Sequence, residues 1–159
     1  MRHILSVLVE NEPGVLSRVS GLFSGRGFNI ETLNVAPTLE EGLSIMTITT
    51  SGEEAIIEQI IKQLRKLVTV VKVVDLTELK AVERETMLIK IDADGDKRAE
   101  ILRIVDIFRC KIIDVSPEDL IVECTGDTGK IAALINMLSR YGIKEIARTG
   151  TVAMRRGMQ

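Results

Sequence analysis

The sequence is poor in the residues on which nucleic-acid recognition and catalysis most often depend. Aromatic residues make up 3% of the 159-residue chain, and tryptophan is absent. Recognition of single-stranded nucleic acid by stacking bases on aromatic side chains is therefore disfavoured. The one histidine, His3, has no obvious serine or cysteine nucleophile beside it, so a half-exposed strand histidine is the simpler interpretation.

Cysteine, net charge and long apolar runs are also scarce. The two cysteines, Cys110 and Cys124, are too few for a disulfide scaffold and lack the close paired spacing of a zinc site, so we expect structural thiols. A net charge of −2 excludes a strong overall basic field, and neither nucleic acid nor an anionic membrane is expected as a partner. No apolar run approaches the roughly 20 residues needed to span a bilayer, so we expect a cytoplasmic protein.

What the chain does contain is a periodic pattern of Ile, Leu and Val, within a hydrophobic share of 45%. Alternation with period two predicts strands, and apolar residues at i, i+3 and i+4 predict helices. In chain order the first half gives a strand at 3–9, a helix from Pro13 to the stop at 25–27, strands at 28–35 and 43–50, a helix opening at 51–54, and a strand at 67–76. This order is that of a ferredoxin-like βαββαβ unit.

The same order begins again after a charged segment. The second half gives a strand at 87–91, a helix at 95–108, strands at 111–115 and 120–124, a helix over 131–138, and a last extended segment at 149–154. We therefore predict an α+β protein with two tandem ferredoxin-like βαββαβ domains, at 1–77 and 86–159, joined by a linker at 78–85. Residues 155–159 are expected to form a loose basic tail.

The segment between the first strand and the first helix is the best candidate for a binding site. Asn11 can cap free amides at a helix start, Pro13 suits a first helical turn, and Gly14 lets another group approach the backbone. Exposed N–H groups at such a helix start favour an anion such as a carboxylate. A well-capped helix without any ligand is the commoner explanation of the same residues.

Two other glycine-containing segments imitate known sites and fail in detail. Residues 126–130 follow a strand and open a helix as a P-loop does, but Cys124 and Ile131 stand where a glycine and a hydroxyl are needed. Residues 92–96 imitate a calcium loop, but the glycine comes one place early and Arg103 replaces the bidentate acid. We expect an ordinary helix cap at the first and a capped turn at the second. No pair of carboxylates is marked out as a general acid and base, so we expect no enzyme activity.

Two stretches carry a resemblance to a known family. They are His3 to Pro37, HILSVLVENEPGVLSRVSGLFSGRGFNIETLNVAP, and Leu64 to Leu79, LRKLVTVVKVVDLTEL. The chain resembles, over essentially its whole length, the regulatory (small) subunits of acetohydroxyacid synthase, also called acetolactate synthase, of the bacterial isozyme III type. The resemblance implies that the first half is an ACT domain, which senses small ligands and dimerises, and that the second half is a further ferredoxin-like domain.

The resemblance also implies a function. Such a chain has no catalysis and no cofactor of its own; it binds a catalytic large subunit that carries thiamine diphosphate, Mg and FAD, activates it, and confers feedback inhibition by valine in branched-chain amino acid biosynthesis. The valine site of such ACT domains lies between two copies in a homodimer. On this sequence it implies Asn11, Gly14, Val15 and Leu16 of one copy facing Asn29 and Ile30 of the other, with Val35 among the apolar contacts. Many ACT domains have aspartate at the position of Asn11.

Other interpretations stay open from the sequence. A free-standing ACT-domain sensor could regulate a different protein, and an enzyme of the same fold would show turnover by the purified chain alone. A transcriptional regulator is disfavoured, because no helix-turn-helix segment and no basic surface signature is present. The polar face over 58–66 is one candidate contact for the catalytic subunit, although a solvated helix face explains the same residues.

Overall fold

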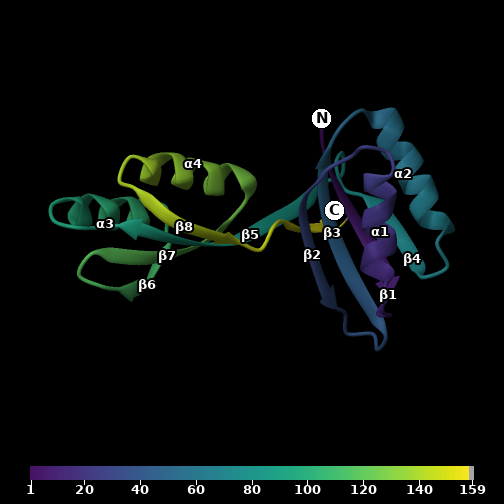
Figure 1. Ribbon diagram of the computed structural model, residues 1–159, viewed down its shortest axis with the longest axis horizontal. Coiled ribbons are helices and arrows are strands. Elements are labelled where there is room, and N and C mark those ends of the chain that lie inside the picture. Colours follow the sequence, from purple (N-terminus) through teal and green to yellow (C-terminus); the bar gives the residue numbers. More distant parts are fainter. Residues whose placement is uncertain (158–159) are drawn as a thin grey trace. The chain divides into compact units, whose positions relative to one another are not determined.

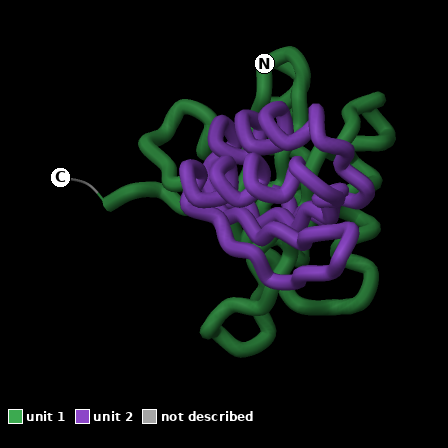
Figure 2. The backbone as a smooth tube through the Cα atoms, turned by 90° about the vertical axis from the view of Figure 1, so that its left-hand side faces the viewer, with its two compact units in different colours: residues 1–82, 151–159 green, residues 83–150 purple. Residues whose placement is uncertain are grey.

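The computed structural model describes residues 1–157, which form two compact units (Figure 2). Unit 1 consists of Met1–Val82 together with the segment that begins at Thr151, and unit 2 consists of Glu83–Gly150. Residues 158 and 159, the end of the predicted tail and of the predicted second domain, lie outside the described part. None of the helices in the described residues is long and apolar enough to cross a membrane.

Unit 1 is an antiparallel sheet with two helices packed on one face (Figure 1). Its elements are β1 (Arg2–Glu10), α1 (Val15–Ser24), β2 (Ile30–Pro37), β3 (Leu43–Ser51), α2 (Glu54–Lys66) and β4 (Val70–Asp75). The strand order is β2-β3-β1-β4, so the first and third strands are central and β2 and β4 are the edges. This is the predicted ferredoxin-like arrangement.

The core of unit 1 follows from the two periodicities of the sequence. Alternate residues of β1, among them Leu5 and Val7, point to the helices. They belong to the same core as the buried stripe of α1, which consists of Val15, Val19 and Phe23. The helix ends as predicted at the glycine pair. Gly27 adopts a φ of 71°, and the Phe28 N–H donates to the Phe23 carbonyl at 2.9 Å, which closes the last turn.

Unit 2 repeats the arrangement, and the predicted fold class is confirmed. Its elements are β5 (Ala81–Asp92, whose first two residues belong to unit 1), α3 (Lys97–Ile107), β6 (Lys111–Val115), β7 (Asp119–Gly126), α4 (Thr128–Ser139) and β8 (Ile143–Arg148). The strand order is β6-β7-β5-β8, and a second aliphatic core lies between this sheet and its helices. The helix face of β5 supplies Met87, Ile89 and Ile91 to that core.

The division of the chain differs from the predicted one at two places. The segment 78–85 is not a linker throughout, because β5 begins at Ala81. Within it, Glu85 is buried and forms an ion pair with Arg148, a residue far along the chain. No local pattern in the sequence marks such a long-range pair.

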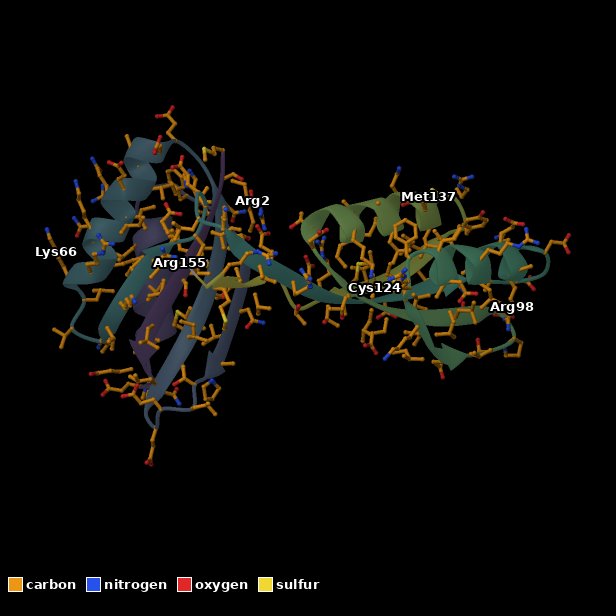
Figure 3. The ribbon with its side chains drawn as sticks, turned by 180° about the vertical axis from the view of Figure 1, so that it is seen from behind. Arg2, Lys66, Arg98, Cys124, Met137 and Arg155 are labelled. Atoms are coloured by element: carbon orange, nitrogen blue, oxygen red, sulfur yellow. The ribbon has the colours of Figure 1, made fainter. Side chains whose placement is uncertain are left out.

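The last segment also departs from the prediction, because it returns to unit 1. β9 (Val152–Arg155) pairs with β5, the Arg156 N–H donates to the Lys80 carbonyl at 2.8 Å, and Arg2 donates to the Thr151 hydroxyl at 3.4 Å. Figures 1 and 3 show β9, which carries the labelled Arg155, on the face of the unit 1 sheet opposite its helices. The predicted extended segment at 149–154 is therefore the route back to unit 1, and the closing strand of unit 2 is β8.

The two thiols are free and lie in unit 2, as expected for structural cysteines. Cys124 is a buried core residue, and Cys110 packs against the same core. Burial, together with the neighbouring Cys124 thiol, raises the pKa of Cys110 from 9.0 to about 12. The folded chain thus holds this proton more tightly than the unfolded chain, and the contribution of the thiol to stability is lost as the pH rises from 9 towards 12.

We expect Cys110 to react with iodoacetamide about 1,000-fold more slowly at pH 8 than a cysteine with an unshifted pKa, because only the thiolate attacks. The rate should keep rising about tenfold per pH unit beyond pH 9. Mass spectrometry of alkylated peptides measures both effects, with the chain unfolded in guanidinium as the control. Labelling of folded Cys110 at the unfolded rate would contradict the assignment.

Candidate ligand site

The loop between β1 and α1 is held in place by backbone hydrogen bonds on both sides. The Glu10 N–H donates to the Thr69 carbonyl and the Asn11 N–H donates to the Gly42 carbonyl, each at 2.8 Å. Within the loop the Glu12 N–H donates to the Glu10 carbonyl at 3.0 Å. The backbone leading into α1 is therefore fixed by the turn before β3 and by the turn before β4.

Gly14, and not Asn11, is the N-cap residue of α1. It adopts a left-handed conformation with φ 85° and ψ −8°, and its carbonyl accepts from the Arg18 N–H at 3.1 Å. The predicted capping role of Asn11 is wrong, since no side chain caps this helix and Asn11 lies three residues before its N-cap. Pro13 precedes the helix instead of opening it, because the left-handed Gly14 separates it from Val15.

The missing cap leaves donors free at the start of the helix. Among the hydrogen bonds of the described residues, none involves the N–H of Gly14, Leu16 or Ser17, and the Val15 N–H makes only a 3.4 Å contact with the Glu12 carbonyl. These groups lie at the positive end of the α1 dipole. A Cβ built on Gly14 would meet nothing within 4 Å, so the space above the loop is open. The arrangement suits an incoming carboxylate.

The structure places the other predicted site residues in different ways. Leu16 and Val35 are 46% and 42% exposed and present apolar surface. Val15 has its side chain buried in the core, so that only its backbone could take part in binding. Asn29 is exposed, and its side chain makes no hydrogen bond among the described residues. Ile30 is partly buried against the core.

The predicted residues do not form a single cluster within one chain. In the register of the sheet, Leu43 at the start of β3 pairs with Glu10, next to the loop, whereas Thr50 near its other end pairs with His3 and Ile30. The seven residue steps from Leu43 to Thr50 separate these ends by on the order of 20 Å. Asn11, Gly14 and Leu16 therefore lie at one end of the sheet and Ile30 at the other, while Val35, which pairs with Met46, lies between them.

Two residues that position the loop were not found from the sequence. Gly42 was predicted only as part of a turn, and its φ of 81° and its hydrogen bond to Asn11 give it a second role. Thr69 lies within a predicted strand, although in the structure β4 begins at Val70. Its carbonyl accepts from Glu10, and nothing in the local sequence signals this contact.

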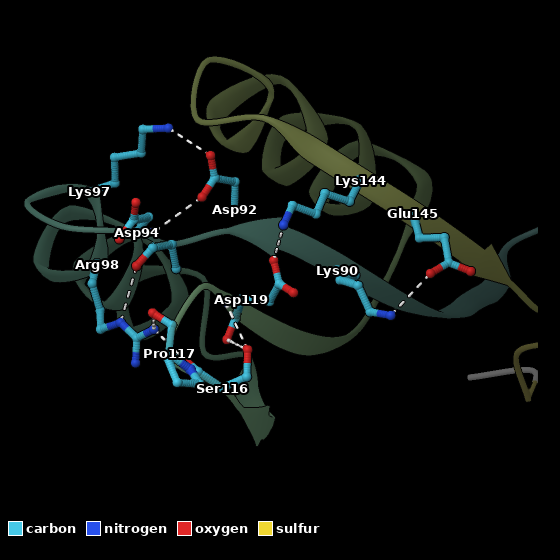
Figure 4. Close-up of polar contacts among 11 residues, drawn as sticks. Lys90, Asp92, Asp94, Lys97, Arg98, Ser116, Pro117, Asp119, Lys144 and Glu145 are labelled. Carbon is cyan, nitrogen blue, oxygen red and sulfur yellow. Dashed lines mark hydrogen bonds and ion pairs between the residues drawn. The ribbon is translucent and has the colours of Figure 1, made fainter.

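The two motifs set aside in the sequence are ordinary structural features in unit 2. The Asp127 carboxylate accepts from the Lys130 N–H at 2.8 Å, which makes it a helix cap, and Lys130 Nζ donates to the Thr125 carbonyl at 3.0 Å. Asp92 accepts from Lys97 Nζ at 2.8 Å and from the Asp94 N–H at 3.1 Å, as expected of a capped turn (Figure 4).

Two carboxylates around this turn, those of Asp92 and Asp119, are paired with lysines. The hydrogen bond from Lys97 lowers the pKa of Asp92, and the hydrogen bond to Asp119 raises the pKa of Lys144. No group of three or more His, Cys, Asp or Glu residues within residues 1–157 is arranged to hold a metal ion. The arrangement therefore gives no support for a cation site here.

An antiparallel βαββαβ sheet that carries an open, glycine-capped loop between its first strand and first helix defines an ACT-type domain. Residues 5–72 match the family model described as the AHAS small subunit-like ACT domain, and residues 84–157 match the model described as the small subunit of acetolactate synthase. The chain belongs to the family of acetolactate synthase small subunits.

Named relatives cover nearly the whole chain. It is 53% identical over 157 residues to the probable acetolactate synthase small subunit of Archaeoglobus fulgidus. This match covers 99% of this chain and 98% of the relative. It is 52% identical over 158 residues to the acetolactate synthase small subunit of Aquifex aeolicus, covering 99% and 82%. The crystal structure of the acetolactate synthase small subunit of Thermotoga maritima superposes with a TM-score of 0.89 at 49% identity, over 100% of this chain and 99% of that one.

Proposed function

We propose that this chain is a non-catalytic regulatory subunit of acetohydroxyacid synthase, which binds the catalytic large subunit, raises its activity and makes it sensitive to feedback inhibition by valine. The observation that carries the valine part is the uncapped start of α1, where donors beside Gly14 have no partner within residues 1–157. Similarity over nearly the full length to proteins named as small subunits supports the partnership. Thiamine diphosphate, Mg and FAD would belong to the catalytic subunit.

Each part of valine has a matching group in this proposal. The carboxylate would accept from the N–H groups of Gly14, Leu16 and Ser17, with the helix dipole adding to the attraction. The ammonium would need the side-chain oxygen of Asn11 or Asn29, or a nearby carbonyl. The isopropyl group would lie on the exposed apolar surface of Leu16 or Val35, or on the partly buried Ile30, of the two copies.

The separation of the two halves in one chain is consistent with a shared site in a homodimer. β2 is an edge strand, and its outer backbone groups have no strand partner in the described chain. If two copies pair antiparallel along β2 about a two-fold axis, the Ile30 end of one strand comes beside the Pro37 end of the other. Pro37 pairs with Ser44, close to the Leu43–Glu10 pair that leads into the ligand loop. Asn29 and Ile30 would thereby approach the loop of the partner copy.

Regulation would follow from linkage. Valine can change the activity of the holoenzyme only by binding one state of the assembly more tightly than another. A ligand held between two copies meets this condition, because its contacts depend on how the copies are arranged.

Co-purification with a thiamine-diphosphate-dependent catalytic subunit, followed by a valine titration of synthase activity, tests the proposal. We expect a stable complex, higher activity with this chain than without it, and inhibition by valine only in its presence. No complex and no change in synthase activity would refute the regulatory role. Valine binding by the chain without any such complex would instead favour a free-standing ACT-domain sensor.

A shared site predicts complementation between two defective chains. Gly14→Asp removes one half of the site and Ile30→Asp the other, so neither variant should bind valine alone. After the two are mixed and re-equilibrated, half of the dimers are mixed and carry one intact site of two, so that about a quarter of all sites should recover. Calorimetry measures the recovered stoichiometry. No recovery, with mixed dimers demonstrated by tagged pull-down, would place both halves in one chain.

A further inference from the structure

Two fully exposed apolar side chains stand at the end of unit 1 that carries the ligand loop. Leu39, in the β2–β3 turn, has a relative exposure of 108%, and Val68, in the turn between α2 and β4, has 93%. Both turns lie at the end of the sheet where β1 ends and α1 begins (Figure 1). Single exposed apolar residues are common, but near-complete exposure at both turns beside a candidate ligand site is a specific feature.

Both side chains are presented by turns with fixed backbones. In the first turn the Thr38 N–H donates to the Leu43 carbonyl at 2.9 Å, and the Thr38 hydroxyl and the Glu40 N–H are within 3.2 Å of each other. In the second turn the Val70 N–H donates to the Leu67 carbonyl at 3.1 Å. An ordered turn does not have to be ordered on binding, so only the side chain itself loses conformational freedom, which favours its use as an anchor.

The same two turns hold the ligand loop. The Gly42 carbonyl, just after Leu39, accepts from the Asn11 N–H, and the Thr69 carbonyl, next to Val68, accepts from the Glu10 N–H. Thr69 is itself buried, and its hydroxyl has no hydrogen-bond partner among the residues that the structure describes. A displacement of either turn would therefore be transmitted to the loop through one backbone hydrogen bond.

The charges beside the two apolar side chains differ in sign. Glu40 and Glu41 follow Leu39 and are exposed, and neither takes part in an ion pair within the described residues. Arg65 and Lys66 precede Val68 and are also exposed. A complementary partner would offer two apolar pockets, with basic residues beside the pocket for Leu39 and acidic residues beside the pocket for Val68.

We propose that Leu39 and Val68 are the apolar anchors with which this chain docks on the catalytic large subunit. The proposal rests on the proposed function and adds to it the contact surface. The turns that carry both anchors also hold the backbone of the ligand loop. Docking of the turns and binding of valine would therefore both affect the conformation of this loop. The contact thus gives valine a direct route to the catalytic subunit.

The test uses Leu39→Asp and Val68→Asp, with Met154→Asp as the matched control, since Met154 is also exposed, at 76%, and lies on β9 of the same unit. The readout is the concentration of this chain that gives half-maximal activation of the catalytic subunit. We expect each anchor variant to raise it by about tenfold or more and the control to leave it unchanged.

Valine calorimetry and sedimentation of each variant alone separate this proposal from the proposed function. We expect wild-type valine affinity, because Leu39 and Val68 are not among the residues proposed to contact valine. We also expect wild-type self-association, because both residues lie outside β2, the strand along which the copies are proposed to pair. Half-maximal activation at the wild-type concentration for both anchor variants would overturn the docking surface while leaving the proposed function intact. Loss of self-association would also overturn it, by assigning these turns to the contact between copies. Failure of the wild-type chain to activate would instead refute the proposed function.

Discussion

Replacing Gly14 by aspartate is expected to abolish valine binding while the chain stays folded. The substitution puts a carboxylate beside the free N–H groups at the start of α1, where the carboxylate of valine would bind. The two negative charges would repel each other. The aspartate side chain would also fill space that is open in the native loop and that the ligand would occupy. The left-handed φ of 85° adds strain of about 1 kcal/mol, which aspartate tolerates better than most residues. We expect affinity to fall by more than about 100-fold, measured by calorimetry.

Gly14→Asn is the matched control for this experiment. Asparagine has nearly the same shape as aspartate and a similar tolerance of the left-handed conformation, but it carries no charge. The difference in valine affinity between the two variants therefore reports the electrostatic part of the site, and we expect asparagine to retain the higher affinity. Thermal melts show whether both chains are folded. Unchanged valine affinity in a folded Gly14→Asp chain would remove this loop from the site.

The fold could be predicted because its signals are local. Alternation along β1 and the spacing of Val15, Val19 and Phe23 define which faces are buried without any knowledge of the partner elements. The end of α1 was equally readable, since its glycines permit the backbone conformation that closes the helix. Repetition of the same order in the second half then led to the tandem architecture.

The details that were missed depend on residues far apart in the sequence. The hydrogen bonds that fix the ligand loop come from the Gly42 and Thr69 carbonyls, which sequence spacing cannot bring to Asn11 and Glu10. The return of β9 to unit 1 is of the same kind. It is a short strand whose place in unit 1 is set by contacts with residues far away in the sequence, among them the hydrogen bonds with Lys80 and Arg2.

The predicted N-terminus of α1 was wrong, and the error bears on function. Asn11 has the residue type of a cap but the wrong spacing, because Gly14 turns the chain at the position where a capping side chain would be. A capped helix would have used one of these donors internally. The uncapped one leaves three of them for a ligand, at some cost in the stability of the helix.

Removing the buried carboxylate of Glu85 is expected to destabilise unit 2 by about 1–3 kcal/mol, because Arg148 loses its partner but its side chain, 42% exposed, is still partly solvated by water. Glu85 is 3% exposed, and both of its oxygens accept from Arg148, at 2.5 Å from Nε and 3.1 Å from Nη2. The same contact raises the pKa of Arg148. The guanidinium stays charged even when its partner is lost, because the ordinary pKa of arginine lies far above neutral pH. Urea unfolding of Glu85→Ala, followed by the circular dichroism signal, measures the effect.

Glu145→Ala is the matched control, because Glu145 also pairs with a base across the same sheet, Lys90 at 3.2 Å, but its side chain is 74% exposed. An exposed pair of this kind contributes about 0–1 kcal/mol, so this variant should unfold near the wild-type midpoint. Replacing both partners of the buried pair, as Glu85→Leu with Arg148→Met, should recover much of the loss of Glu85→Ala, since no unpaired charge remains. Equal destabilisation by Glu85→Ala and Glu145→Ala would show that burial of the Glu85 carboxylate does not set its contribution to stability.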